Sequence, residues 1–289
     1  MWKLRGWDVD VRASEAEMHA AALAREAAAA GSQVVFACGG DGTLNEVING
    51  LVGTPARLAV LRGGTGNVFG KEVRVPRKLE AALEVIDRGR EYRFDLGYAE
   101  GEGVAGTSAL GRKRRYFLLM AGAGFDGAVV RRVPKRPKRL LGTASYVIWG
   151  AAEALRFKSR EVSLVLDGQR RTDPRLYWLL LGNTRSYGGV ADVALKAIAD
   201  DGLLDVYMFA GGGIPWIIAT GARIALKRHQ HARGVDYACA RSLTIETPGL
   251  QVQADGEYFG ESPMTLGVET RVLPVLLFPG APERIIRGG

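Results

Sequence analysis

The stretch "FACGGDGTLNEVINGL", residues 36–51, joins an apolar run to a helical pattern through glycines, an aspartate and a threonine. The run that leads into it, "SQVVFAC", is typical of a strand buried on both faces of a parallel sheet. Behind the glycines, apolar residues recur at helical spacing at Leu44, Val47, Ile48 and Leu51. The stretch therefore predicts a buried strand that ends at glycines and is followed at once by a helix.

The same order of elements recurs on both sides of this stretch. Upstream, the alternation at 7–14 predicts a strand, and the alanine-rich residues 14–31 predict a helix opened by an S-x-x-E capping box at Ser14. Downstream, "RLAVLRGG", 57–64, predicts another strand, and 76–89 predicts a helix that ends at a glycine. Alternating strands and helices indicate a doubly wound α/β domain with a parallel sheet.

Beyond Arg93 the pattern changes to short apolar strands joined by glycine turns. One helix is expected, at 143–157, and the small residues at 101–111 predict a hairpin tip. The predicted strands lie at 92–100, 114–125, 161–171, 176–184, 203–211, 241–249 and 250–260. The prediction is an α/β domain over 1–93 and a mostly antiparallel β-sandwich domain over 94–275, with the tail 276–289 returning to the first domain.

Composition narrows the class of protein. The chain has 289 residues, of which 47% are hydrophobic, and its mean hydropathy is near zero. The longest apolar run, 213–226, contains Arg223 and is shorter than the roughly 20 residues of a membrane span. Neither Cys38 nor Cys239 has a CxxC partner, so we expect buried, reduced thiols of a cytoplasmic protein without a signal peptide. His229 and His231 are expected at a solvated helix end.

Positive charge is clustered. The net charge is +8, and basic residues gather at 112–115 ("RKRR") and 131–139 ("RRVPKRPKR"). Such clusters suit nucleic acid, anionic lipid head groups or phosphorylated substrates, whereas solvated basic loops are the alternative. No recognised nucleic-acid-binding module is present, so no nucleic-acid partner is expected.

The two glycine-rich turns favour phosphate chemistry. Ligands of open α/β sheets lie beyond the carboxyl ends of strands, where glycines allow close backbone approach and helix N-termini attract anions. Thr43, Thr65 and Asn67 would add hydroxyl and amide contacts. Asp41 would repel phosphates unless a cation lay between them, which favours a water-mediated Mg²⁺ role; capping of the next helix is the alternative. The P-loop, Rossmann and protein-kinase motifs are absent.

The longer stretch "GGDGTLNEVINGL" resembles the signature of the diacylglycerol-kinase catalytic domain, a superfamily with bacterial lipid kinases and sphingosine and ceramide kinases. NAD kinases and phosphofructokinases share only its GGDGT core. The resemblance continues in order over most of the chain. Its further segments are "RGGTGNVFGKEV" (62–73), "FDLG" (94–97), "FLLMAGAGFDGAVV" (117–130), "KRLLGTASYVIWGAAEAL" (138–155), "ADDGLLDVYMF" (199–209) and "QADGEYFG" (253–260).

The resemblance implies ATP-dependent phosphorylation of a lipid hydroxyl, with the nucleotide between the two domains. Asp41 and Asp95 would organise the catalytic Mg²⁺, and Glu257 would be the general base with Asp255 beside it. Asp201 would bind a structural Mg²⁺ with backbone oxygens of Ile198 and Leu203. The residues implied around the nucleotide are Ser14, Gly39, Gly40, Asp41, Gly42, Thr43, Leu44, Asn45, Glu46, Gly64, Thr65 and Asn67.

The sequence also departs from the family pattern. The first strand and the Asn-Pro loop that contact nucleotide are not found before residue 7, which would leave a sheet edge exposed. Leu195 and Lys196 stand where a proline-led turn is usual. The alternatives are therefore an NAD-kinase-like enzyme or a truncated, catalytically weak nucleotide- or lipid-binding relative. The expected partners are a lipid, diacylglycerol by default, and the anionic inner membrane face; exposed edges of the second sheet would permit a homodimer.

Overall fold

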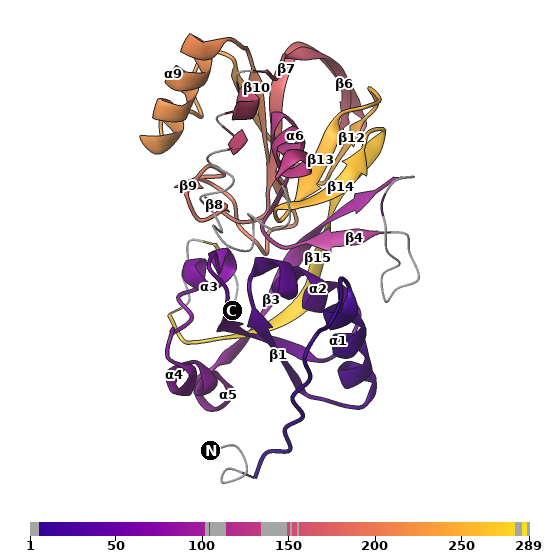
Figure 1. Ribbon diagram of the computed structural model, residues 1–289, viewed down its shortest axis with the longest axis vertical. Helices are drawn as coiled ribbons and strands as arrows, with labels where there is room; N and C mark the ends of the chain where they lie inside the picture. Colours follow the sequence, from indigo (N-terminus) through magenta and orange to yellow (C-terminus); the bar gives the residue numbers. More distant parts are fainter. Residues whose placement is uncertain are drawn as a thin grey trace.

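The computed structural model describes residues 6–101, 104, 114–133, 149–150, 152–154, 156–280 and 285–287. Figure 1 shows an α/β part below and a β-rich part above, joined by the long strand β15 (Met264–Leu277). One path through the sheet runs β1–β2–β15–β12–β6–β7–β5–β13–β14. The two parts therefore share a continuous hydrogen-bonded sheet.

The α/β part is built on two parallel strands, β1 (Val34–Gly39) and β2 (Arg57–Arg62). The four periodic residues of the glycine-led helix are all buried, which confirms that helix. The strand before it forms, but it is not buried on both faces as predicted. Ala37 is buried and Cys38 is exposed, because β1 pairs on one side among the described strands. Short connections place the helices beside the sheet. They are α1 (His19–Ala29), α2 (Asp41–Leu51), α3 (Val68–Glu72), α4 (Leu79–Leu83) and α5 (Val85–Arg88).

Two predictions in this part are wrong. Residues 7–14 form no strand but an exposed extended segment, because their alternating side chains have no sheet or core to cover; Val11 is largely exposed. The helix after it begins at His19, so the capping box at Ser14 does not form. Its cap comes from another helix, since the Ala20 amide donates to a carboxylate oxygen of Glu46 at 3.1 Å.

The expected helix at 76–89 is divided into α4 and α5, which meet at Glu84. Gly89 ends α5, as predicted. The short helix α3 was not predicted, because five residues are too few to show a period.

The second part is mostly antiparallel, as predicted, and its strands pair as hairpins and meanders. The strands in chain order are β3 (Arg90–Glu100), β4 (Arg115–Phe117), β5 (Met120–Gly124), β6 (Arg160–Leu166), β7 (Gln169–Gly182), β8 (Ser186–Tyr187), β9 (Ala191–Asp192), β10 (Leu204–Ala210), β11 (Val235–Ala240), β12 (Ser242–Ile245), β13 (Gln251–Ala254), β14 (Glu257–Glu261) and β15. Two helices here were not predicted, α6 (Phe125–Arg132) and α9 (Ile214–Ala225).

Strand β15 ties the two parts together. It pairs antiparallel with β3 on both sides of an irregularity between Glu269 and Leu273, and Val275 then lies opposite Leu58 of β2 in parallel register. Strand β3 runs through the predicted domain limit at residue 93, and β15 runs through the predicted limit at residue 275. At the other side of the α/β sheet, β1 pairs with β2 alone among the described strands.

Three single-residue expectations are corrected. His229 is fully buried rather than solvated, with Nε2 2.8 Å from the Val193 carbonyl oxygen and its ring against Tyr207. Cys38 and Cys239 are both exposed, because each side chain points away from the core on its strand; both are free thiols. The predicted hairpin tip and the helix at 143–157 lie mostly outside the described residues.

Among the described residues, no helix combines the length and the apolar character that crossing a bilayer requires.

Candidate active site

The two glycine turns meet backbone to backbone. The Gly63 amide donates to the Gly39 carbonyl oxygen at 3.1 Å, and a Cβ on Gly64 would overlap the Cα of Gly40. Glycine is needed at Gly64 because the two chains touch there, whereas a Cβ on Gly40 would lie 3.7 Å from its nearest neighbour. The close approach fixes the relative position of the two turns.

This asymmetry gives a first prediction. Gly64→Ala should lower the free energy of unfolding by about 2 kcal/mol, because the methyl group meets backbone that cannot rotate away. Gly40→Ala should leave stability within about 0.5 kcal/mol, since Gly40 has φ −87 and ordinary contacts. Urea unfolding of both variants measures the difference; equal losses would contradict it.

The second glycine turn is closed by its own asparagine and by Asp41. The Gly64 amide donates to Oδ1 of Asn67 at 2.9 Å, and the Asn67 amide donates back to the Gly64 carbonyl oxygen. The Val68 amide donates to Oδ1 of Asp41 at 2.7 Å, and a Cβ on Gly66 would lie 2.6 Å from the other carboxylate oxygen. Asp41 therefore binds the start of α3 as well as beginning α2.

Burial raises the pKa of Asp41, against the opposing effect of the Val68 and Phe69 amides and nearby Lys71. A cation beside the carboxylate would offset the cost of burying its charge. The carboxylate of Asp41 thus fits a Mg²⁺ ion at Oδ2, while Oδ1 accepts the hydrogen bond of the Val68 amide.

An open anion cradle lies at the start of α2. Gly40 is the N-cap, and within the described residues no side chain forms a cap hydrogen bond on this 11-residue helix, so amides of its first turn could take a ligand. A Cβ on Gly42 would meet one atom within 4 Å, Oε1 of Glu257 at 3.2 Å. The structure therefore brings the glycine turn of the first part against the Asp-Gly-Glu turn of the second.

Glu257 is held by a residue that sequence reasoning missed. Arg115 forms an ion pair with Oε2 of Glu257, its guanidinium lies 4.4 Å from the centre of the Phe259 ring, and its side chain is only 9% exposed. In the sequence, Arg115 is one of four consecutive basic residues, so nothing distinguished it from a surface charge. The ion pair uses Oε2 of Glu257, so Oε1 of the same carboxylate faces the glycine turn.

Asp255 is a clamp between the two parts. Asp255 and Gly256 both have positive φ (48 and 78), which gives the tight turn between β13 and β14. The carboxylate accepts hydrogen bonds of 2.8–3.1 Å from the amides of Leu118, Leu119 and Met120 and from Nδ2 of Asn45. Burial raises its pKa to about 6 despite these four donors.

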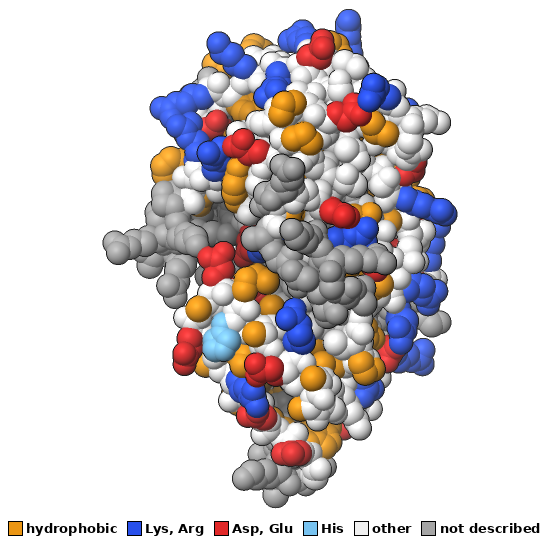
Figure 2. Space-filling view, turned by 90° about the vertical axis from the view of Figure 1, so that its right-hand side faces the viewer, with side chains coloured by type: hydrophobic (Ala, Val, Ile, Leu, Met, Phe, Trp, Pro, Cys, Tyr) orange, Lys and Arg blue, Asp and Glu red, His pale blue; other side chains and the backbone are white. Residues whose placement is uncertain are grey.

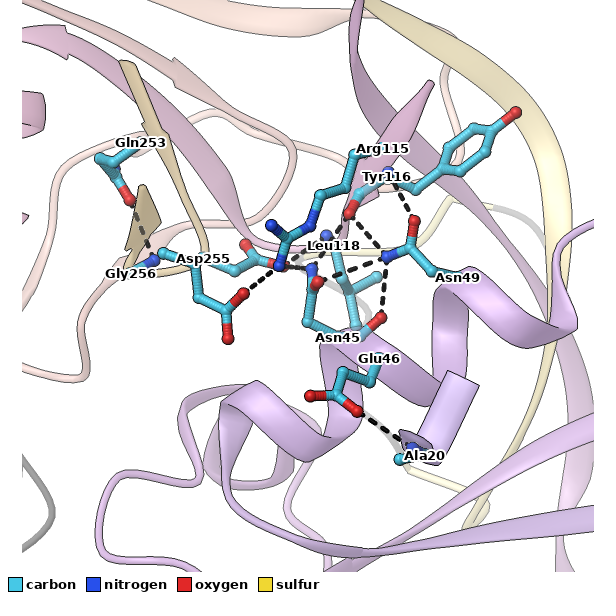
Figure 3. Close-up of polar contacts among 11 residues, drawn as sticks. Ala20, Asn45, Glu46, Asn49, Arg115, Tyr116, Leu118, Gln253, Asp255 and Gly256 are labelled. Carbon is cyan, nitrogen blue, oxygen red and sulfur yellow. Dashed lines mark hydrogen bonds and ion pairs between the residues drawn. The ribbon is translucent and has the colours of Figure 1, made fainter. Parts of the chain in front are cut away.

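Two asparagines of α2 complete the clamp. Figure 3 shows Asn45 and Asn49 pointing from α2 toward Tyr116 and Asp255. Both amide nitrogens donate to the Tyr116 carbonyl oxygen at 3.0 Å, and the Tyr116 amide donates to Oδ1 of Asn49 at 2.8 Å. The buried side chain of Asn45 therefore joins α2 of the first part to Tyr116 and Asp255 of the second part.

Asp95 and Asp201 lie together at a second place. The Asp95 carboxylate accepts from the Arg271 amide at 2.7 Å and from the Gly202 amide at 2.6 Å. Asp201 accepts from the Leu203 amide at 3.1 Å. The partners of Asp95 thus belong to the turn at 198–203 and to β15. Asp41 and Glu257, in contrast, each lie against a glycine turn, at Gly66 and at Gly42 respectively.

The residues predicted to bind a structural Mg²⁺ lie on the turn at 198–203. Burial raises the pKa of both Asp95 and Asp201, and the charge of Asp200 adds to both shifts. A cation would relieve this crowding, and the Arg287 guanidinium already lies 3.8 Å from Oδ2 of Asp201. The ion at Asp201, Ile198 and Leu203 stays a prediction. In the described part of the chain, no group of three or more His, Cys, Asp or Glu side chains has an arrangement that could hold a metal.

The remaining predicted nucleotide residues lie in different surroundings. Thr43 lies over Gly39, and Thr65 is exposed on the second glycine turn. Leu44 is buried in the core. Ser14 is exposed in the segment before α1. Their roles toward a nucleotide stay predictions.

The described members of the two basic clusters are engaged with carboxylates. Arg114 pairs with Glu100 and Glu269, and Arg131 pairs with Glu261. On the face in Figure 2, blue lysine and arginine side chains are interspersed with red carboxylates. Residues 112–113 and 134–139 lie outside the described residues.

A buried carboxyl group also connects to the Asp-Gly-Glu turn. Tyr187 donates to Oδ1 of Asp126, and Nε2 of Gln253 donates to Oδ2 at 2.6 Å. The Gln253 side chain accepts from the Gly256 amide at 2.9 Å. Asp126 is fully buried, and burial raises its pKa to about 6.

This shift predicts a pH dependence of stability. Because the folded state holds the Asp126 proton up to about pH 6, whereas the unfolded chain releases it near the ordinary value of 3.8, the folded state binds more protons between these values. The free energy of unfolding should therefore fall as pH rises through this window, with this group contributing on the order of 1–3 kcal/mol. Asp126→Asn should gain stability relative to the parent between pH 4 and pH 6.5. The prediction is contradicted if Asp126→Asn and the parent differ in free energy of unfolding by the same amount at pH 4 and at pH 6.5.

The chain matches two protein families in succession. Residues 1–99 match the diacylglycerol kinase catalytic domain, and residues 120–277 match the YegS C-terminal NAD kinase beta sandwich-like domain. The two matches follow the α/β part and the β-rich part of the structure.

Curated relatives extend this result. A diacylglycerol kinase of Mycobacterium tuberculosis is 30% identical over 255 residues, which cover 88% of this chain and 80% of the relative. A Pseudomonas syringae protein named "Probable lipid kinase YegS-like" is 31% identical over 266 residues, covering 88% and 78%.

The fold is also that of a solved structure, a diacylglycerol kinase from Bacillus anthracis, with TM-score 0.67 and 21% identity over 93% of this chain and 84% of that one. The glycine turns, the Asp-Gly-Glu turn facing them and these matches agree: the chain belongs to the diacylglycerol-kinase family of lipid kinases.

Proposed function

We propose that the protein transfers the γ-phosphoryl group of ATP to the hydroxyl of a lipid, with diacylglycerol as the first acceptor to test. The observation that carries this proposal is the 3.2 Å approach between Oε1 of Glu257 and the position of a Cβ on Gly42. A carboxylate that could take a proton from a hydroxyl faces the turn that could hold phosphates. The names of the relatives support a lipid acceptor.

Phosphates would lie on the first turn of α2 and on the adjoining turn at Gly64 and Thr65. The uncapped amides of α2 supply donors, and the glycines leave room for close approach. Bound Mg²⁺ would neutralise phosphate charge, with Asp41 as the residue that holds it at the glycine turns.

Glu257 acts on the acceptor. Its carboxylate takes the proton of the lipid hydroxyl as the hydroxyl oxygen forms a bond to the γ-phosphorus. The bond from that phosphorus to the bridging oxygen breaks, and ADP leaves. Arg115 orients the carboxylate through Oε2 and keeps Oε1 toward the phosphates. The reaction would take place at the cytoplasmic face of the membrane, where both ATP and the lipid are present.

The direct test is transfer of labelled γ-phosphate from ATP, with and without Mg²⁺. Diacylglycerol, sphingosine, ceramide and phosphatidylglycerol in mixed micelles are the acceptors, and NAD is the soluble control. Label in a lipid supports the proposal and identifies the acceptor class. Label in NAD alone, or ATP binding without transfer, would overturn it.

Arg115 provides a third prediction. Arg115→Gln should lower kcat about tenfold to a hundredfold with little change in the KM for ATP, because the base loses its fixed orientation but remains present. Arg114→Gln is the matched control, since it removes the neighbouring arginine but not the contact to Glu257. Equal effects of the two substitutions would show that Arg115 has no special role.

A further inference from the structure

Helix α9 turns an apolar stripe to solvent. Ile214 is 54% exposed, and Ile218 and Leu226 are each 66% exposed. Gly221, Ala222 and Ala225 are exposed between them, so the stripe continues at helical spacing along the whole helix. A soluble helix normally turns this kind of stripe toward the core.

The opposite side of α9 is anchored. The Trp216 ring packs 5.3 Å from that of Tyr177, Ile217 and Ile224 pack on the core, and Thr220 is buried. The exposed stripe is therefore a fixed surface on a docked helix. Figure 1 places α9 at the outer edge of the β-rich part.

Basic side chains lie at the C-terminal end of the stripe. Arg223, Lys227 and Arg228 are exposed there. Lys227 forms an ion pair of 2.7 Å with Asp192, which leaves the two arginines to set the local charge. Arg223 lies at the border of the stripe in the last turn of α9, and Arg228 follows the end of the helix. Apolar residues with cations at their border match a surface that is apolar below and anionic above, as an anionic bilayer is.

The stripe is connected to the candidate active site. Lys227 binds Asp192 on the β8–β9 hairpin, whose tip carries Val190, 61% exposed. At the same tip, a Cβ on Gly189 would lie 3.4 Å from Val68 of α3. Val68 is the residue whose amide binds Asp41.

We propose that the α9 stripe, made of Ile214, Ile218, Leu226 and neighbouring Val190, is the docking surface for an anionic lipid bilayer. The helix lies in the plane of the interface with its apolar residues below the head groups and Arg223 and Arg228 among the phosphates. This inference rests on the proposed function, because a lipid acceptor requires the enzyme to reach a membrane.

The experiment is flotation with vesicles of phosphatidylglycerol and phosphatidylcholine in equal parts, without ATP. The double variant Ile214→Ser/Ile218→Ser should bind the vesicles at least about tenfold more weakly than the parent does. Leu79→Ser is the matched control, since Leu79 is 50% exposed but lies on α4 in the other part of the chain. Circular dichroism and thermal midpoints establish that each variant is folded.

Charge is tested separately. Arg223→Gln/Arg228→Gln should bind about tenfold more weakly to the anionic vesicles, whereas Arg88→Gln on α5 should bind as the parent does. Binding to pure phosphatidylcholine should be weak for all of them. Kinase activity toward a short-chain, monomeric diacylglycerol should be unchanged in the α9 variants.

The outcomes separate the two proposals. Vesicle binding lost with the α9 variants and kept with Leu79→Ser supports the docking surface, whether or not the chain proves to be a kinase. Equal binding by all variants would overturn it and leave the kinase proposal standing. A change of molecular mass in solution on mutating α9 would also overturn it, because the stripe would then be an interface between two copies.

Discussion

Replacing Glu257 with glutamine is expected to lower the rate of phosphoryl transfer about a hundredfold to ten-thousandfold, with ATP binding nearly unchanged. Glutamine keeps the size and position of the side chain but cannot accept the proton of the acceptor hydroxyl. The loss should appear in kcat, because the contact is made as the proton moves and not when the nucleotide binds. Single-turnover rates and ATP titrations measure the two quantities.

The control for this variant concerns Arg115. Glutamine removes the charged partner of a mostly buried guanidinium, which costs stability as well as chemistry. Glu257→Asp keeps the charge but shortens the reach, so it should retain more stability than activity. If Glu257→Gln transfers phosphate at the parental rate once it is shown to be folded, another group is the base.

The elements around the glycine turns were predictable because their signals are local. A continuous apolar run gave β1, and helical spacing gave α2 with its four buried residues. The strand at 7–14 shows the limit of such signals, since alternation does not supply a partner strand or a core. Strand β15 was missed, because Gly267, Arg271 and Pro274 interrupt its pattern and its two neighbours lie far away in the chain.

The contact between the two motifs of the candidate site agrees with the sequence prediction, whereas the directions of its side chains were not predictable, and the roles of its residues stay predictions. The ordered segments brought Asp41 and Glu257 into one site, and the structure places the two turns in contact. The sequence could not show that Asn45 points toward Tyr116, or that Glu46 caps α1. Nor could it select Arg115 from a basic run, because an ion pair over 142 positions leaves no local trace.

The clamp at Asp255 carries the largest expected effect on stability. Asp255→Ala should lower the free energy of unfolding by about 3–5 kcal/mol, because three backbone amides and the Asn45 amide lose a buried, charged acceptor at once. The native φ of 48 adds strain for alanine. Asp255→Gly removes the same hydrogen bonds without that strain, so the difference between the two variants isolates the backbone contribution, about 1 kcal/mol.

A double-mutant cycle then tests whether the clamp joins the two parts. Asn45→Ala and Asp255→Gly should show a coupling of about 1 kcal/mol or more, since each removes one side of the same contact. Asn49→Ala serves as a comparison, because Asn49 also holds Tyr116 but its hydrogen bonds do not include Asp255. Urea unfolding followed by fluorescence gives all four free energies. Additive losses for Asn45 and Asp255 would mean that each acts within its own part. The orientation of Glu257 toward the glycine turn would then depend on β15 and the other junction contacts.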